Sequence, residues 1–399
     1  MQPIEIKPNI FWIGVNDTST ELFEGLWPIE KEGVSYNSYL IKDEKNVLID
    51  LCKELFQDAY LSDLKTLIDP SEIDYLVVNH MEPDHSGALQ AFRKMAPQAK
   101  ILATKKAVQM MEDFFGIREL IQPISDGEKI SLGEKELTFI TAPMVHWPET
   151  MMTYEATTGV LFSCDAFGGY GILTDSIFDD EHKDISFYEQ ESLRYFSNIV
   201  AAFSKPVLNA AAKLGDLSIK MVAPSHGLVW RSAPERIIEL YLTWSGYSKG
   251  TAERGVALLY GSMYGNTLRM VPKMIEGLEK AKLPFAAHDI TTTHVSFILP
   301  DVWKYQGVLI GAPTYEGSIF PTMATVLEMF QYKRIFNRQA AYFGSYGWGG
   351  GATRYLAAKF EVLKWELTGT LEFTGQPSQE NLAQAVDFSK RFGHLIKTL

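Results

Sequence analysis

The chain has 399 residues, 46% of them hydrophobic, and a formal net charge of −12 at pH 7. This length exceeds the usual size of one domain, so we expect two domains with separate cores. The acidic balance argues against a nucleic-acid-binding surface, and no apolar run resembles a membrane span or a secretory signal. The two cysteines, Cys52 and Cys164, are too few for a disulfide framework, so we expect core thiols in a cytoplasmic protein.

Residues 1–250 alternate short β-type runs with turns and a few helical stretches, a pattern that favours a mixed sandwich. The stretch 181–214 carries an apolar stripe at helical spacing and is expected to cover one face of a sheet. The expected strands are Ser38–Lys42, Asn46–Asp50, Tyr75–Asn79, Leu137–Thr141, Gly159–Ser163 and Ile219–Ala223.

A different rhythm begins after the polar stretch Ser248–Arg254, which we interpret as a linker. Over residues 251–399 the order strand, loop, helix repeats, and this alternation predicts a parallel, doubly wound sheet. The expected strands are Gly255–Tyr260, Phe285–Ile290, Gly307–Gly311, Ala340–Gly344 and Thr368–Phe373.

The segment His80–His85 reads H-M-E-P-D-H and directly follows an apolar β-type run. Three later side chains of the same ligand type each stand at the end of a predicted strand. Any one of them alone is more often a hydrogen-bonded core group, but together they favour two metals that share a bridging carboxylate. The candidate ligands are His80, Glu82, Asp84, His85, His146, Asp165 and His226.

Three loops of the second domain indicate a flavin site. Residues 261–267 offer hydroxyls, backbone N–H groups and a helix start to a phosphate, resembling the flavodoxin phosphate loop and neither a Walker motif nor G-x-G-x-x-G. Loops 312–317 and 345–350 can hold an isoalloxazine ring, although the last one alone could equally be a Gly-rich turn. No adenine site is evident, which favours FMN over FAD. The candidates are Ser262, Met263, Tyr264, Gly265, Asn266, Thr267, Pro313, Thr314, Tyr315, Gly317, Ser345, Tyr346, Gly347, Trp348 and Gly349.

The order of the metal segments resembles the metallo-β-lactamase superfamily, whose hydrolytic members carry H-x-H-x-D-H and bind zinc. Here Glu82 replaces the second histidine, and a hard carboxylate favours iron. H-x-E-x-D-H followed by a flavodoxin-like module resembles the flavodiiron proteins, or A-type flavoproteins, over essentially the whole chain. The resemblance implies a metallo-β-lactamase-like αββα sandwich over 1–250 and a flavodoxin-like doubly wound sheet over 251–399, hence a chain of α+β and α/β parts.

The same resemblance implies a reaction and an assembly. Dioxygen would be reduced to water, nitric oxide to nitrous oxide, or both, at a centre of two iron ions with electrons delivered through FMN. Family members form head-to-tail homodimers, or dimers of dimers, in which the FMN of one subunit faces the diiron site of the other. In the family pattern His80, Glu82 and His146 would ligate one iron, Asp84, His85 and His226 the other, and Asp165 would bridge them.

Two alternatives stay open from the sequence: a dinuclear hydrolase fused to a flavodoxin module, and a non-catalytic electron carrier with a structural metal. The chain stops at Leu399, soon after an amphipathic helix, so we expect a separate electron donor such as rubredoxin, a reductase or a reduced deazaflavin. The segment Glu21–Trp27 and Tyr154 could line a gas pocket, but isolated aromatics more often pack in a core.

Overall fold

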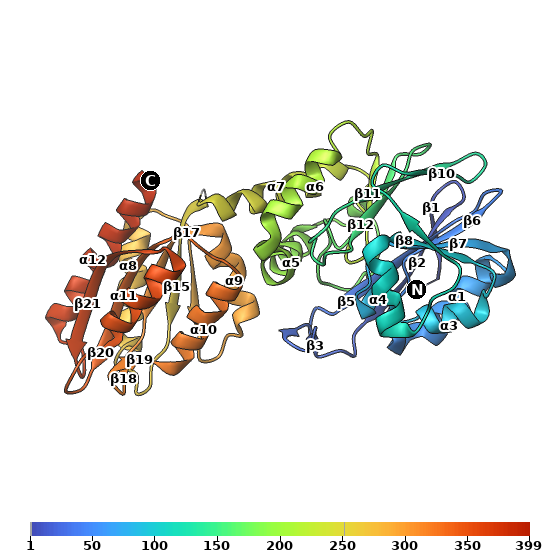
Figure 1. The fold of residues 1–399 in the computed structure, drawn as a ribbon. Helices are drawn as coiled ribbons and strands as arrows, with labels where there is room; N and C mark the ends of the chain where they lie inside the picture. Colours follow the sequence, from blue (N-terminus) through green and yellow to red (C-terminus); the bar gives the residue numbers. More distant parts are fainter. Residues whose placement is uncertain (1, 251) are drawn as a thin grey trace. The chain divides into compact units, whose positions relative to one another are not determined.

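The structure is a computed structural model that describes residues 2–250 and 252–399 (Figure 1). The chain forms two compact units, Met1–Leu242 and Thr243–Leu399. The division falls inside helix α7 (Pro234–Gly246), ahead of the boundary near residue 250 that the sequence suggests. Within the expected linker, Thr251 lies outside the described residues, and residues 253 and 254 already belong to a strand.

Unit 1 contains two mixed sheets. The first has the strand order β1-β2-β5-β6-β7-β8-β9 and the second the order β10-β11-β12-β13-β14. The strands are β1 (Ile4–Lys7), β2 (Ile10–Asp17), β5 (Val34–Ile41), β6 (Asn46–Ile49), β7 (Ile73–Val78), β8 (Lys100–Thr104), β9 (Ile121–Ile124), β10 (Lys129–Ser131), β11 (Glu136–Thr141), β12 (Met151–Glu155), β13 (Val160–Cys164) and β14 (Met221–Pro224), with a small β3 (Leu22–Phe23) and β4 (Trp27–Pro28) hairpin.

The two sheets of unit 1 pack face to face. Every residue of β5 is buried, as expected for a strand with a core on both faces. The Tyr39 ring of β5 lies 5.0 Å from the Phe162 ring of β13, and the Tyr39 hydroxyl donates to the carbonyl of Pro224 in β14. The helices of this unit are α1 (Gln57–Leu67), α2 (Pro83–Ser86), α3 (Leu89–Met95), α4 (Lys105–Phe115), α5 (Ser186–Tyr195), a π-helical turn (Phe196–Val200), α6 (Ser204–Lys213) and the first part of α7.

Unit 2 is built on one parallel sheet with the strand order β16-β15-β17-β20-β21. The first strand of the unit therefore lies between the second and the third, an order that places a ligand crevice at the carboxyl ends of the strands. The strands are β15 (Glu253–Tyr260), β16 (Phe285–Asp289), β17 (Tyr305–Gly311), β20 (Gln339–Tyr346) and β21 (Glu366–Thr374), with a short β18 (Thr314–Tyr315) and β19 (Ser318–Ile319) hairpin.

Apolar alternation along β15 explains how helices cover both faces of this sheet. Val256 and Leu258 belong to a buried cluster that also holds Met274 of α8 and Phe392 of α12. The intervening Ala257 is equally buried, so the strand has a core on each side. The helices are α8 (Val271–Ala281), α9 (Val295–Lys304), α10 (Pro321–Tyr332), α11 (Ala352–Leu363) and α12 (Gln379–Thr398).

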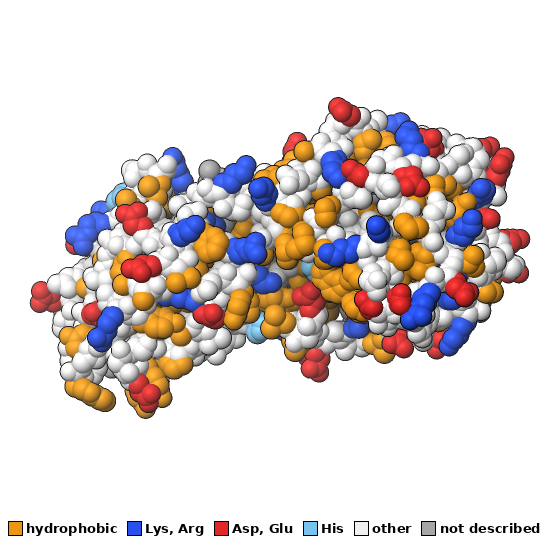
Figure 2. All heavy atoms as spheres, viewed as in Figure 1, with side chains coloured by type: hydrophobic (Ala, Val, Ile, Leu, Met, Phe, Trp, Pro, Cys, Tyr) orange, Lys and Arg blue, Asp and Glu red, His pale blue; other side chains and the backbone are white. Residues whose placement is uncertain are grey.

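Both expected architectures, the mixed sandwich and the parallel doubly wound sheet, are confirmed. The expected helical stretch 181–214 is also present, with α5 beginning at Ser186, and both cysteines are buried free thiols. Figure 2 shows acidic and basic side chains interspersed over the visible face of each unit. Among residues 2–250 and 252–399, no helix combines the length and apolar character that crossing a membrane requires.

Candidate metal centre and cofactor pocket

Four ligand-type side chains of unit 1 converge on one point. His80 and Glu82 follow β7, His146 follows β11, and Asp165 follows β13. Glu82 Oε2 lies 3.2 Å from His80 Nε2 and 2.9 Å from His146 Nε2. Asp165 Oδ2 lies 3.3 Å from each of the same two nitrogens. The four ligand atoms are within 4.8 Å of one another, close enough to hold one ion.

A second group lies directly beside the first. Asp84 and His85 belong to the short helix α2, and His226 follows β14. His226 Nε2 lies 3.3 Å from Asp84 Oδ2, and His85 Nε2 lies 3.4 Å from Asp84 Oδ1. Asp165 Oδ1 lies 2.9 Å from His85 Nε2 and 3.5 Å from His226 Nε2. Asp165 thus turns one oxygen to each group, which is the position of a bridging carboxylate.

The hydrogen bonding of these side chains fits bound cations. Both carboxylate oxygens of Asp84 and of Asp165 are buried, as are the Nε2 atoms of His85 and His226, and none of these atoms has a hydrogen-bond partner within the described chain. Carboxylates that are buried and face only imidazole nitrogens are costly unless a cation compensates their charge. Histidine nitrogens and carboxylate oxygens that face one another across such a space form a donor set suited to iron or zinc.

The electrostatics point the same way. Burial opposes the charged imidazolium, yet the carboxylates of Asp165 and Glu82 raise the pKa of His146 to about 9. Against the same burial, Asp165 and Asp84 raise the pKa of His226 to about 10. The carboxylates therefore create a negative potential at these imidazoles, and the same potential attracts metal cations. Bound metal ions would displace the protons from these imidazoles.

Strand ends and tight turns hold the ligands in place. Asp50, at the end of β6, accepts hydrogen bonds from the Asn79 backbone N–H at 2.7 Å and its side-chain amide at 3.0 Å, which fixes the loop that carries His80. Ser86 Oγ donates to the carbonyl of Met81 at 2.8 Å and so closes the turn of α2. Cys164 adopts a left-handed φ of +55° immediately before the candidate bridge, a strained backbone of the kind that gathers at functional sites.

A cavity of about 220 Å³ opens beside the second group. Tyr36 forms part of its wall, with its hydroxyl donating to Asp17 at 3.0 Å, and Lys53 donates to Thr20 Oγ1 at 2.6 Å. The cavity is lined by Phe23, Glu24, Tyr36, Lys53, Glu82, Pro83 and Asp84.

Within the segment Glu21–Trp27, Phe23 and Trp27 are buried as the core interpretation expects, and Phe23 and Glu24 also line the cavity. The ring of Phe23 lies edge-on to His226, with the ring centroids 5.7 Å apart. Tyr154, by contrast, is a buried packing residue whose hydroxyl donates to the carbonyl of Ser218 at 3.0 Å. The sequence pattern did not identify Tyr36 and Lys53 as cavity residues, because in the sequence they look like ordinary strand and turn residues.

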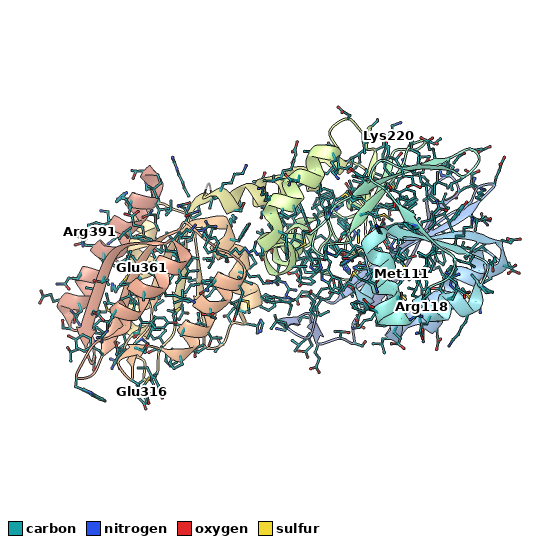
Figure 3. The ribbon with its side chains drawn as sticks, viewed as in Figure 1. Met111, Arg118, Lys220, Glu316, Glu361 and Arg391 are labelled. Carbon is teal, nitrogen blue, oxygen red and sulfur yellow. The ribbon has the colours of Figure 1, made fainter. Side chains whose placement is uncertain are left out.

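Unit 2 contains a pocket of about 450 Å³ at the carboxyl ends of its strands. Figure 3 places Glu316, one of its lining residues, at the β18–β19 end of the unit. Ser262 Oγ accepts from the N–H of Gly265 at 3.0 Å, and Gly265 has a left-handed φ of +84° that suits glycine. Thr267 Oγ1 lies 3.2 Å from Ser345 Oγ, which ties the first loop to the third.

The pocket gathers thirteen of the predicted cofactor residues into one lining. Gly265 and Thr267 shape the loop without lining the pocket. Glu316 and Gly375 also line it and were not predicted; Gly375 follows β21, a fourth loop that carries no motif. The lining comprises Ser262, Met263, Tyr264, Asn266, Pro313, Thr314, Tyr315, Glu316, Gly317, Ser345, Tyr346, Gly347, Trp348, Gly349 and Gly375.

Comparison with known proteins assigns both units. Residues 34–227 match the family described as ODP family beta lactamase, and residues 258–388 match the flavodoxin family. The first range contains all seven candidate ligands, and the second contains the whole lining of the pocket.

Full-length relatives extend the match over both units in one chain. The nitric oxide reductase of Moorella thermoacetica is 33% identical and aligns over 99% of each chain. The crystal structure of the flavodiiron protein from Giardia intestinalis superposes with a TM-score of 0.93 at 27% identity, over 100% of this chain and 97% of the other. The chain is a flavodiiron protein. Its flavodoxin domain implies FMN, and its lactamase-like domain implies a pair of irons.

Other relatives of this flavodiiron protein carry different names. The rubredoxin oxygen:oxidoreductase of Desulfovibrio gigas superposes with a TM-score of 0.93 at 27% identity, over 100% of this chain and 99% of the other. The anaerobic nitric oxide reductase flavorubredoxin of Vibrio vulnificus is 34% identical over 98% of this chain and 80% of that protein. The lactamase-like sandwich and the flavodoxin-like sheet expected for this flavodiiron protein are thereby confirmed.

Proposed function

We propose that this flavodiiron protein reduces dioxygen to water, nitric oxide to nitrous oxide, or both, at a diiron centre that receives electrons through FMN. The observation that carries the proposal is Asp165, whose two oxygens divide between two ligand groups in a chain that also forms a flavin pocket. The similar proteins named nitric oxide reductase and rubredoxin oxygen:oxidoreductase support both gases as substrates.

The ligand groups assign each iron to a set of side chains. Two irons bound there supply one-electron redox chemistry and open positions for a diatomic gas. Because Glu82 stands where a zinc-binding relative would have histidine, the set is harder and more negative, which favours iron. His80, Glu82 and His146 would hold one iron, Asp84, His85 and His226 the other, and Asp165 both.

FMN would bind in the pocket of unit 2. Among the described lining residues there is no Lys or Arg, so the phosphate would be held by backbone N–H groups and hydroxyls of the loop 262–267. The loops 313–317 and 345–349 would hold the isoalloxazine ring. Thr314 Oγ1 is buried without a partner in the described chain and is available to hydrogen-bond the flavin.

The side chains around the metal centre select a small substrate. A cavity of about 220 Å³ is below the range of about 300–1,000 Å³ typical of organic ligands, but it admits a diatomic gas. The rings of Phe23 and Tyr36 each pack edge-on against His226 and add apolar surface beside the second ligand group.

We further propose the head-to-tail homodimer, or a dimer of such dimers, in a cytoplasmic protein. Its support is the mouth of the flavin pocket, where the Trp348 side chain is fully exposed and that of Tyr264 is 87% exposed. Large exposed rings around a redox pocket are typical of a surface that is covered in an assembly. A Trp348→Phe variant should reduce its iron more slowly, and an unchanged rate would place Trp348 away from the subunit junction.

Electrons would reach the FMN from a separate donor: rubredoxin, a reductase or a reduced deazaflavin. The names of the similar proteins from D. gigas and V. vulnificus make rubredoxin the first donor to test. Stopped-flow mixing of each reduced donor with the oxidised protein should identify the donor by the rate of flavin bleaching.

One experiment separates the proposed function from its rivals. Purified protein is analysed for iron, zinc and flavin, its FMN is reduced without oxygen, and dioxygen or nitric oxide is then added. We expect two irons and one FMN per chain and flavin reoxidation by at least one gas. Zinc together with activity in the absence of reductant would indicate a hydrolase. A flavin that cycles without consuming either gas would indicate a simple carrier.

A further inference from the structure

The two ligand groups are chemically matched in their inner contacts. Apart from the shared Asp165, each group consists of two histidines and one carboxylate. Inner ligands alone therefore give no reason for the two irons to differ in reduction potential. A difference in reduction potential must therefore come from the side chains and backbone groups that hydrogen-bond to the ligands.

The outer contacts of the histidines are unequal. In the first group, His80 Nδ1 lies 2.6 Å from Glu149 Oε1, so its N–H donates to a carboxylate; the Thr150 hydroxyl lies farther away, at 3.5 Å. In the second group, His226 Nδ1 lies 2.7 Å from the carbonyl oxygen of Ser35, so its N–H donates to a neutral acceptor. Both bonds leave Nε2 free for a metal.

Burial and several hydrogen bonds fix Glu149 in its position beside His80. Its side chain is fully buried, and Oε1 also accepts from the backbone N–H of Met81 at 2.9 Å. Its carbonyl accepts from Thr104 Oγ1 at 2.8 Å, which anchors its backbone beside the start of α4. Oε2 has no hydrogen-bond partner in the described chain. A carboxylate so placed needs a nearby positive charge, and His80 on a metal provides it.

A second buried carboxylate, Asp50, interacts electrostatically with His85 and, less strongly, with His80, but it hydrogen-bonds neither ring and so does not match the direct contact of Glu149 with His80. Its two oxygens are taken by the backbone and side-chain N–H groups of Asn79. It therefore holds the loop rather than a ligand of the second group, and His85 Nδ1 has no partner among the described residues.

We infer that Glu149 is a positioning residue that makes the two irons unequal. A carboxylate acceptor raises the basicity of the imidazole and stabilises the ferric state of the iron it holds. An iron held by Asp84, His85 and His226 would then have the higher reduction potential, and an iron held by His80, Glu82 and His146 the lower. The inference rests on the proposed function, because it requires iron in both positions.

The test compares three proteins that are loaded with iron and titrated without oxygen. The mixed-valence state is followed by electron paramagnetic resonance, and iron content is measured in parallel. The wild-type protein should be reduced in two separate steps with a mixed-valence signal between them. Glu149→Gln keeps the shape of the side chain but removes its charge. It should bring the two steps together, shrink the signal, and bind one of its two irons about 10- to 100-fold more weakly.

Glu155→Gln is the matched control. Glu155 is also a fully buried glutamate, but its oxygens accept from the backbone N–H groups of Thr157 and Thr158 rather than from a ligand histidine. This control should keep the two wild-type steps. If Glu149→Gln does not fold, Glu149→Asp, which lengthens the bond, should shift the steps in the same direction by less.

The outcomes are distinct. One merged reduction step in the wild-type protein, or unchanged separation in a folded Glu149 variant, would overturn the inference while leaving the proposed function intact. Wild-type protein that binds no iron would instead overturn the proposed function.

Discussion

Arg338 is the residue of unit 2 for which the loss of stability on substitution can be worked out most directly. Its side chain is 1% exposed and lies directly before β20, the strand that leads to the third flavin loop. The guanidinium donates to the carbonyls of Val302 at 3.1 Å, Trp303 at 2.7 Å and Phe336 at 2.9 Å. The first two belong to the last turn of α9, where the helix leaves its carbonyls without intrahelical donors.

The expected loss of unfolding free energy follows from these three hydrogen bonds. Burial lowers the pKa of Arg338 to about 10, so the guanidinium is still charged at pH 7. Arg338→Met keeps the apolar stem but leaves three carbonyls without their donor, each at a cost of about 1–3 kcal/mol. Relief from burying a charge offsets part of this cost. We expect a net loss of about 3–5 kcal/mol of unfolding free energy for unit 2.

The assay is urea unfolding at a fixed excess of FMN, followed by the recovery of free-flavin fluorescence, which reports on unit 2. The fixed ligand concentration keeps the contribution of binding constant. Arg338→Lys, which retains a charge but fewer donors, should lose less than Arg338→Met. Arg391→Met, on the exposed surface of α12 (Figure 3), is the control and should change stability by no more than about 0.5 kcal/mol. A loss below about 1 kcal/mol for Arg338→Met would refute the reasoning.

Three further changes test other parts of the chain. Gly351→Ala would place its Cβ 2.0 Å from the carbonyl oxygen of Gly317, so equilibrium dialysis should show FMN binding weakened at least about tenfold, by forced separation of two pocket loops. Against burial, hydroxyl and backbone donors that include Tyr36 lower the pKa of Asp17 to about 2. Asp17→Asn should therefore cost about 1–2 kcal/mol at pH 7. This stabilisation is complete above pH about 4 and is lost as pH falls towards 2, so denaturant midpoints of variant and wild type should converge on acidification. Glu82→His should raise the ratio of zinc to iron in protein purified from cells given both metals; an unchanged ratio would show that residue 82 does not set metal identity.

The candidate metal ligands could be predicted because each carries a local signal. His80, Glu82, Asp84 and His85 lie within one short loop after a strand, and His226 ends another strand. Strand assignment placed each candidate at a strand end, but β7 belongs to one sheet and β11, β13 and β14 to the other, so the packing of the two sheets is what brings the candidates together. The flavin loops were also recognisable from a local signal, since Gly-rich turns after buried strands mark the crevice of a doubly wound sheet.

The residues that support the ligands could not be found in this way. Glu149 contacts His80 across 69 positions of sequence, and nothing in the run Trp147-Pro148-Glu149 distinguishes it from a surface turn. Tyr36 reads as an ordinary strand residue, and its contact with Asp17 depends on the pairing of β2 with β5. Such side chains are selected by three-dimensional packing, which leaves no periodic trace in the sequence.

Charge explains why it matters for both metal positions that residue 82 is a glutamate and not the histidine of the H-x-H-x-D-H motif. Glu82, Asp84 and Asp165 place three carboxylates around two metal positions, all of them wholly or largely buried. Three negative charges nearly neutralise two divalent ions and only partly neutralise two trivalent ones. In a poorly solvated site the uncompensated charge is costly, so each added carboxylate lowers the energy of the oxidised pair more than that of the reduced pair. Glu149 extends this effect to one side of the centre only. A zinc enzyme, whose metal keeps one charge throughout its cycle, gains nothing from such tuning. A centre that must pass between ferrous and ferric states benefits from this tuning, because its charge changes during the cycle.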